Sequence, residues 1–317
     1  MAELIGKNGT WTFDGDLLRI VPGHDKDVPR LRVALGEIEL PLTALAGIAF
    51  EATPEAGKKA KSGAGRVRVR LRAGSDPLTQ ACGGRIADEA DPYQLDVPAE
   101  RGGVAEYFAD EVRDALTAAR IPSDPADRYL VAAPPVPISA NGQDGTGSFD
   151  GDVVRLEWGW LADLKKRSAG NREWPLSALE AVEWRPAVGM DWGWIRFRIR
   201  GDAGIVSQNP RLDPNCLTLW GTKKESGNSA VLAAAIVGRM PHPNAAPEKP
   251  SPADDVDTDA AAAAAAAAVA AVATPAAAGS DHDALLRRLR ELGDLHRDGV
   301  LTDEEFATAK QAVLKQL

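Results

Sequence analysis

The chain has 317 residues, of which 44% are hydrophobic and 26% are charged, and its formal net charge is -9 at pH 7. This composition is typical of a globular protein with two or three domains. Because the globular part is not basic overall and the acidic excess lies mainly in the C-terminal tail, we expect no binding to duplex nucleic acid.

The chain shows no pattern for export or membrane insertion. Residues 1–9 do not show the pattern of a signal peptide, in which a basic segment is followed by an apolar one and then by small residues. The longest candidate for a membrane span, residues 260–273, is almost all alanine and too short. The only cysteines, Cys82 and Cys216, are far apart, and we interpret them as buried thiols rather than metal ligands or a disulfide. We therefore expect a cytoplasmic protein without membrane association, metal or cofactor.

An internal repeat organises the first 242 residues. Residues 9–20 (GTWTFDGDLLRI) match residues 145–156 (GTGSFDGDVVRL) at seven of twelve positions. Two further blocks follow in the same order in both copies, ELPLTAL against EWPLSAL and GRVRVRLR against GWIRFRIR. A duplicated unit of this size predicts two similar domains.

Each copy combines strand and helix patterns. The Asp14-Gly15 and Asp150-Gly151 pairs between apolar residues predict a β-hairpin at the start of each copy. The third block alternates strictly, which predicts a half-buried strand. Apolar residues at helical spacing predict a closing helix over 104–120 in the first copy and over 229–239 in the second.

The G-T-x-x-F-D-G-D and P-L-[ST]-A-L motifs resemble a bacterial pleckstrin-homology-like family of unknown function, of an actinobacterial type. The resemblance covers most of the chain. It implies a mainly β fold with helices: two tandem, partly open antiparallel β-barrels, each with a C-terminal helix, a fold used mainly as a binding scaffold. In contrast to many phosphoinositide-binding relatives, the first hairpins carry acidic turns at 14–16 and 150–152, which would repel a phosphate.

Composition shifts set the expected domain boundaries. A proline-rich linker is expected to act as a semi-extended spacer that leaves the copies some independence, and a second linker rich in proline and alanine is expected to be a disordered tether. The predicted organisation is the first copy at 1–122, the linker at 123–136, the second copy at 137–242, the tether at 243–280 and a helical hairpin at 281–317.

The sequence lacks the recurrent catalytic motifs. It contains no GxSxG, Walker loop, HExxH or GxGxxG pattern, and the glycines of 142–151 are explained by the hairpin turn. We therefore expect a non-enzymatic protein without catalytic residues.

Two aligned rows of arginine are the best candidates for a binding face. Because they alternate with apolar residues, each row lies on one face of a strand, where guanidinium groups can bind phosphates or carboxylates. We favour the alternative of a solvated face that covers apolar surface and discourages edge pairing. Two tryptophans share the second row's face and can stack on bases, sugars or partner side chains, although core or inter-domain packing explains them better. The candidate face comprises Arg68, Arg70, Arg72, Trp192, Trp194, Arg196, Arg198 and Arg200.

Two further basic clusters are interpreted as solvated loops. They comprise Lys58, Lys59 and Lys61 in the first copy and Lys165, Lys166 and Arg167 in the second, and they do not fall at equivalent positions.

The last 37 residues resemble the SHOCT family, the short C-terminal domain, through spaced leucines, the Asp298-Gly299 turn and the VLTDEEF segment at 300–306. Thr302 and Glu305 form a capping box that starts the second helix. The residues from Asp294 to Glu305 also fit a calcium loop in spacing, but His296 stands where a hard oxygen ligand is needed, so we expect no calcium. The resemblance implies self-association or an interaction, with Leu285, Leu289, Leu292, Phe306, Val313 and Leu317 as candidate oligomerisation residues.

Together these patterns predict a binding or scaffolding protein with a protein partner, which forms a homo-oligomer through its C-terminal hairpin. The alternative is a peripheral binder of anionic lipid or single-stranded nucleic acid that uses the arginine and tryptophan faces.

Overall fold

The computed structural model describes residues 1–52, 65–201, 209–220 and 223–245, and it places side chains in these ranges except at 223–226. The chain divides into two compact units, Met1–Glu248 and Lys249–Leu317. The tether, the hairpin with its six candidate oligomerisation residues, the calcium-like loop and the cluster of Lys58, Lys59 and Lys61 lie outside the described residues.

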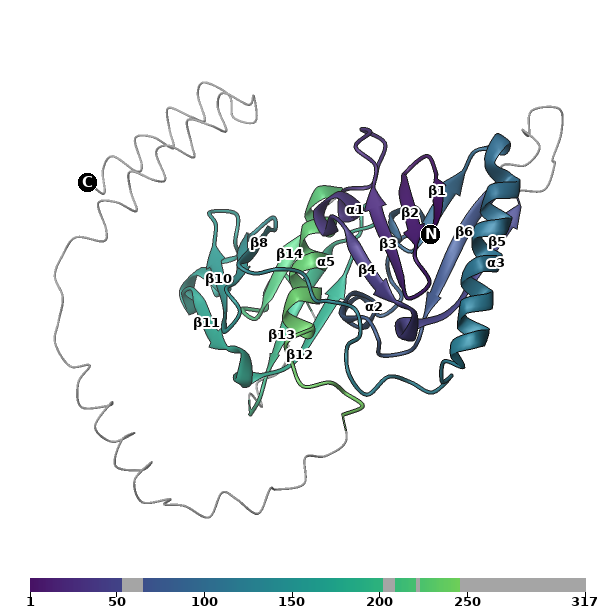
Figure 1. The fold of residues 1–317 in the computed structure, drawn as a ribbon. Coiled ribbons are helices and arrows are strands. Elements are labelled where there is room, and N and C mark those ends of the chain that lie inside the picture. Colours follow the sequence, from purple (N-terminus) through teal and green to yellow (C-terminus); the bar gives the residue numbers. More distant parts are fainter. Residues whose placement is uncertain (53–64, 202–208, 221–222, 246–317) are drawn as a thin grey trace, which may run out of the picture. The chain divides into compact units, whose positions relative to one another are not determined.

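The first copy forms two antiparallel sheets (Figure 1). The four-stranded sheet has the order β1-β2-β3-β4, with β1 at Ala2–Ile5, β2 at Gly9–Phe13, β3 at Leu17–Pro22 and β4 at Ile38–Pro41. The three-stranded sheet has the order β5-β6-β7, with β5 at Leu45–Ala52, β6 at Gly65–Leu71 and β7 at Gln94–Val97. The helices are α1 at Arg30–Leu35, α2 at Pro77–Cys82 and α3 at Gly102–Ala119, with short 3-10 turns at Leu42–Ala44, Asp88–Ala90 and Ala99–Arg101.

The second copy repeats this arrangement. Its four-stranded sheet contains β8 at Ile138–Asn141, β9 at Gly145–Phe149, β10 at Val153–Trp158 and β11 at Arg172–Pro175. Its three-stranded sheet contains β12 at Leu179–Arg185, β13 at Gly193–Ile199 and β14 at Cys216–Leu219. The helices are α4 at Leu164–Ala169 and α5 at Lys223–Val237, and a 3-10 turn covers Leu176–Ala178.

The structure confirms the mainly β character of the fold. The described strands form four antiparallel sheets, none of which closes into a barrel. Strands β1 and β8, which precede the predicted hairpins, and the short helices α1, α2 and α4 were not expected from the sequence pattern. No helix in the described ranges is long and apolar enough to cross a bilayer.

The two predicted hairpin turns are present. Gly15 and Gly151 have φ values of 114° and 122°, a region that L-residues with a side chain rarely adopt. In each turn the preceding aspartate caps the backbone: the Asp14 Oδ1 atom accepts hydrogen bonds from the amides of Asp16 and Leu17, and Asp150 does the same in the second copy. These local bonds explain why the same four-residue motif gives the same turn twice.

The alternation of the third block is confirmed as well. Strands β6 and β13 have the same burial pattern, with their apolar residues toward the core and their arginines on the other face. The closing helices are longer than predicted: α3 begins two residues before 104, and α5 begins six residues before 229.

The two closing helices differ in how they are buried. Helix α3 packs on β1, β5 and β6 (Figure 1). Its buried residues include Phe108 and Val112, while Tyr107 is 61% exposed. Every residue of α5 from 230 to 237 is buried. This helix contacts α1 and α2 of the first copy as well as β8, β9 and β12 of its own copy. A helix that is apolar on all sides needs such enclosure, so α5 belongs to the cores of both copies.

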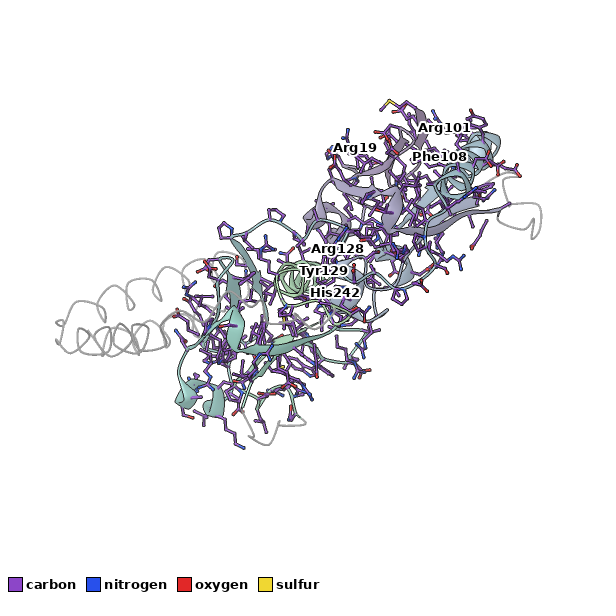
Figure 2. All side chains as sticks on the ribbon, turned by 60° about the horizontal axis from the view of Figure 1, so that its bottom comes forward. Arg19, Arg101, Phe108, Arg128, Tyr129 and His242 are labelled. Atoms are coloured by element: carbon purple, nitrogen blue, oxygen red, sulfur yellow. The ribbon has the colours of Figure 1, made fainter. Side chains whose placement is uncertain are left out.

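The linker between the copies is attached to the first copy. The amide of Ala126 donates to the carbonyl of Ala73, and the amide of Val131 donates to the carbonyl of Ser75. The ring of Tyr129 lies edge-on to that of His242 with 4.6 Å between centroids, and Figure 2 shows the two side chains next to each other. The expected spacer is thus held by backbone bonds, and independent folding of the two copies remains a prediction.

Candidate binding surfaces

The arginines of the first row have three different environments. Arg68 forms an ion pair with Asp88, with 3.0 Å between Nη2 and Oδ1, and Arg70 is exposed. Arg72 donates to two backbone carbonyls, at Asp124 in the linker (2.7 Å) and at Thr43 (3.0 Å). The row is therefore not a continuous set of available guanidinium groups.

Arg66 extends this row at its start, and the sequence interpretation missed it. Its guanidinium lies 2.8 Å from the carboxylate of Asp96 and 2.5 Å from that of Asp88. The hydrogen bond to Asp96 is the main cause of the raised pKa of Arg66, and burial acts in the opposite direction. The strict alternation of the strand already placed Arg66 on the same face, and this is the signal that could have found it.

The second row is compensated by acidic residues in the same way. The Nε atom of Arg196 lies 2.9 Å from a carboxylate oxygen of Asp213, and only 11% of the Arg196 side chain is exposed. Arg198 pairs with Glu183 on β12 at 2.7 Å, whereas Arg200 is exposed at the end of β13. Carboxylates thus contact two of the three guanidinium groups that alternation placed on this face.

The two tryptophans of the candidate face have different neighbours. The rings of Trp192 and Trp220 lie 4.5 Å apart, and the Arg211 guanidinium is 5.1 Å from the Trp192 ring centroid. The Cζ atoms of Arg185 and Arg196 lie 5.0 Å and 5.9 Å from the centroid of the Trp194 ring. At these distances a cation is attracted by the indole face.

Trp194 lines a cavity of about 280 Å³ to which both copies contribute. The second copy supplies residues of β12 and β13, including Arg185 and Glu183, and the first copy supplies the end of α2 together with Arg85. An indole next to arginines in a concave site can bind an aromatic or anionic group.

A surface around α4 exposes large apolar side chains. Trp160 is 62% exposed, Leu161 48% and Leu164 72%. Helix α4 begins 134 positions after α1, and the same offset separates the ELPLTAL and EWPLSAL blocks. With this offset, the first copy has Lys26, Asp27 and Arg30 at the places of Trp160, Leu161 and Leu164. We call Trp160, Leu161 and Leu164 the α4 apolar surface. The fold does not require these residues to be apolar, because the first copy builds the same element with charged ones.

The basic cluster beside this surface was only partly interpreted correctly. Lys165 and Arg167 are exposed, as expected of a solvated loop. Lys166 is fully buried: its Nζ atom donates to the carbonyl of Cys216 at 2.6 Å and to the carboxylate of Asp144. The interpretation was wrong for Lys166 because its partners are 22 and 50 residues away in the chain and leave no local pattern.

Burial also raises the pKa of the two thiols and of Asp76. Desolvation raises the pKa of Cys216 to about 12 and raises that of Cys82, which confirms the prediction of buried thiols. Desolvation raises the pKa of Asp76, whose side chain caps α2 and accepts a hydrogen bond from the Tyr93 hydroxyl at 2.7 Å. These groups stabilise the fold and form no array of a nucleophile and a base.

The repeated strand order and the shared helix define a protein built from two tandem, mainly β units. The chain belongs to the family described as a domain of unknown function, DUF4429, whose matches cover residues 11–113 and 147–237, more than half of its length. Residues 287–314 match the family described as the short C-terminal domain. A search of curated proteins found no match.

Proposed function

We propose that this chain is a non-catalytic binding and scaffolding protein. Its two pleckstrin-homology-like units engage a protein partner, and its C-terminal segment adds self-association. The observation that carries the proposal is the α4 apolar surface, in which three large side chains are exposed where the first copy has charged ones.

The chemistry of this surface favours a protein. Exposed aromatic and aliphatic side chains gathered within one short segment are typical of an interaction site, since they lower the solubility of a monomer unless a partner covers them. Lys165 and Arg167 border the surface and are exposed, while Asp163 accepts a hydrogen bond from the Lys165 amide at the start of α4. A partner with an apolar centre and acidic residues at its edge fits this arrangement.

Substitution by the residues of the first copy tests the proposal. The variant Trp160→Lys, Leu161→Asp, Leu164→Arg keeps a sequence that the fold already accepts at α1. The wild-type and variant chains are used for affinity capture from the native cell, and captured proteins are identified by mass spectrometry. We expect at least one protein to be retained by the wild type and lost in the variant.

A matched control changes two other exposed apolar residues of the same copy, Val188→Lys and Met190→Asp, which are 65% and 84% exposed. This control is expected to capture the same proteins as the wild type. Equal capture by all three chains would remove the α4 apolar surface from the proposal.

The alternative function is binding of anionic lipid or single-stranded nucleic acid. The observation that favours it is the position of Trp194 near Arg185 and Arg196, at the 280 Å³ cavity that Trp194 and Arg185 line. Binding to vesicles rich in phosphatidylglycerol or to an oligonucleotide, weakened by salt and by Arg185→Gln, would support this alternative. Protein capture that persists at high salt supports the scaffold instead.

A further inference from the structure

In each copy, the third residue of a short helix, α1 or α4, is a buried cation. Arg32 on α1 is 5% exposed and Lys166 on α4 is fully buried. The Arg32 Nη1 atom donates to the carbonyl of Gln94 at 2.7 Å, as Lys166 does to Cys216 at 2.6 Å. Gln94 and Cys216 are the first residues of β7 and β14, so the two bonds are structurally equivalent.

The residue that precedes β2 or β9 completes the comparison. In the second copy, one oxygen of Asp144 accepts from the amide of Thr218, and the other oxygen contacts Lys166. In the first copy, Asn8 occupies this place, and its oxygen accepts from the amide of Asp96. The Asn8 amide nitrogen is a donor to the Asp96 carboxylate, at 3.2 Å. The first copy thus has a neutral amide where the second copy has the carboxylate that neutralises the buried cation.

The acidic residues around Arg32 are engaged with other groups. Asp96 is paired with Arg66, and Asp88 is paired with both Arg66 and Arg68. The Asp91 carboxylate accepts hydrogen bonds from the Tyr93 amide and from the side chain of Gln94. Burial lowers the pKa of Arg32, against the attraction of Asp91 and Asp96, but an arginine stays charged at neutral pH.

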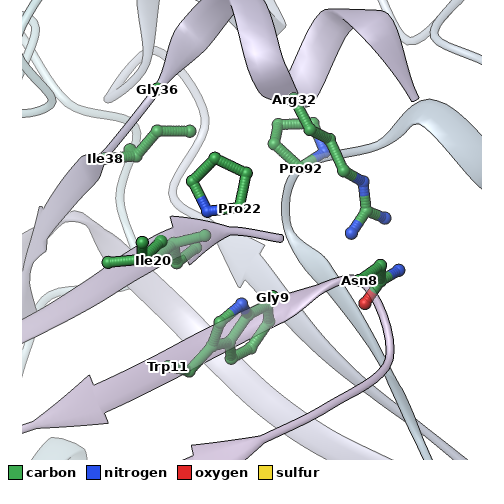
Figure 3. Close-up of a pocket in the computed structure, with 10 residues that line it drawn as sticks. Asn8, Gly9, Trp11, Ile20, Pro22, Arg32, Gly36, Ile38 and Pro92 are labelled. Carbon is green, nitrogen blue, oxygen red and sulfur yellow. The ribbon is translucent and has the colours of Figure 1, made fainter. Parts of the chain in front are cut away.

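The Arg32 side chain lines a small cavity whose opposite wall includes Asn8 and Trp11, with Pro22 and Pro92 beside it (Figure 3). The buried Nε atom of Arg32 has no hydrogen-bond partner in the described part of the chain. The cavity volume is about 10 Å³, close to the space that one water-sized group occupies. A buried charge without a counter-charge in contact is costly, and a small anion in this cavity would remove that cost.

We propose that Arg32 binds a small monoanion, chloride or the end of a carboxylate, in the cavity that it lines together with Asn8, the residue that replaces Asp144 of the second copy. The guanidinium supplies the charge and donors, and Trp11, Ile20 and Pro22 line the apolar part of the cavity. Tetrahedral phosphate is too large for this volume. The proposal concerns a site of the first copy and does not depend on the proposed partner surface.

Thermal unfolding of the full chain tests the site. Sodium chloride or sodium formate replaces sodium gluconate at constant ionic strength, so that only the anion changes. With one of the two small anions, we expect the Tm to rise by about 3 °C and then to level off as the concentration of that anion increases. Saturation with chloride identifies a halide site, saturation with formate identifies a carboxylate site, and a Tm independent of both anions overturns the proposal.

Two variants locate the effect. Arg32→Met keeps the length of the side chain without its charge and is expected to abolish the dependence on the anion. Asn8→Asp supplies the carboxylate of the second copy and is expected to raise the Tm in gluconate while removing the response to chloride and formate. The control Arg70→Met, an exposed arginine of the same copy, is expected to respond like the wild type. If either Arg32→Met or Asn8→Asp folds and keeps the full response, the anion binds elsewhere and the assignment is wrong.

Discussion

The arginines in and directly after β13 alternate regularly in the sequence, but their side chains differ in solvent exposure. Arg196 is held against Asp213, of which only 7% is exposed, whereas Arg200 projects into solvent at the strand end. The same residue type on the same face therefore contributes to stability at one position and to surface charge at another. Alternation indicates the face of a strand, and the partners decide what a charge does there.

This difference predicts unequal effects of two identical substitutions. Arg196→Gln leaves the buried carboxylate of Asp213 without its cation, and we expect it to lower the free energy of unfolding by about 1–3 kcal/mol. Arg200→Gln is expected to change it by less than about 0.5 kcal/mol, as is usual for exposed sites. Chemical denaturation of both variants measures the difference, and equal effects would contradict the ion pair seen here.

At the scale of elements, equivalent helices have been adapted to different surroundings. Helix α1 contacts α5, while α4 presents Leu164 to solvent. Helix α3 packs with one face, and α5 packs on elements of both copies. Trp184 on β12 also donates a hydrogen bond to the Ser229 hydroxyl at 2.9 Å, which ties α5 to its own sheet. The same element therefore has different neighbours in the two copies, and the apolar residues of α4 are not explained by packing within the described part of the chain.

Close packing of α5 on α1 predicts a glycine requirement. A Cβ atom at Gly227 would lie 3.0 Å from the Leu31 amide nitrogen and 3.3 Å from the Arg30 carbonyl carbon, so α1 would have to move. We expect Gly227→Val to destabilise the protein by about 1–3 kcal/mol through overpacking. Gly103→Val on α3, where a Cβ atom meets nothing within 4 Å, is the matched control. Comparable losses in thermal denaturation for both variants would indicate that α5 does not approach α1 this closely.

At the scale of the whole molecule, the chain combines a unit of two linked copies with a C-terminal unit from Lys249 to Leu317. The first unit has a continuous hydrophobic core that includes residues of both copies and of α5. The match to the short C-terminal domain at 287–314 falls in the second unit. A binding surface on one unit and a self-association segment on the other would give avidity without any additional contact.

Removal of the C-terminal segment should change the oligomeric state. A segment of 37 residues at 281–317 is short for an independent core, and its leucine and phenylalanine stripes gain about 1.5–3 kcal/mol per large side chain when another copy covers them. Light scattering is expected to show an oligomer for the full chain and a monomer for residues 1–280. Identical monomer masses for both chains would exclude self-association through this segment and leave a different protein as its partner.

The sequence by itself determined the features that depend on neighbours in the chain. The Asp-Gly turns, the alternation of β6 and β13 and the presence of a closing helix in each copy follow from bonds and spacings within a few residues, and the repeat makes each of them visible twice. The same local patterns could not separate Lys166 from Lys165 and Arg167, or α5 from α3.

Only the tertiary structure decided which charges are buried and which helix is shared. The contacts of Lys166 with Asp144 and of Arg196 with Asp213 join residues that the fold of the second copy brings together, and the contact of α5 with α1 joins the two copies. The free energy of a charge depends on its distance to other charges and to water, and a linear sequence does not contain these distances. For this reason only the three-dimensional structure places Asn8, and no carboxylate, beside Arg32 where the second copy has Asp144 beside Lys166.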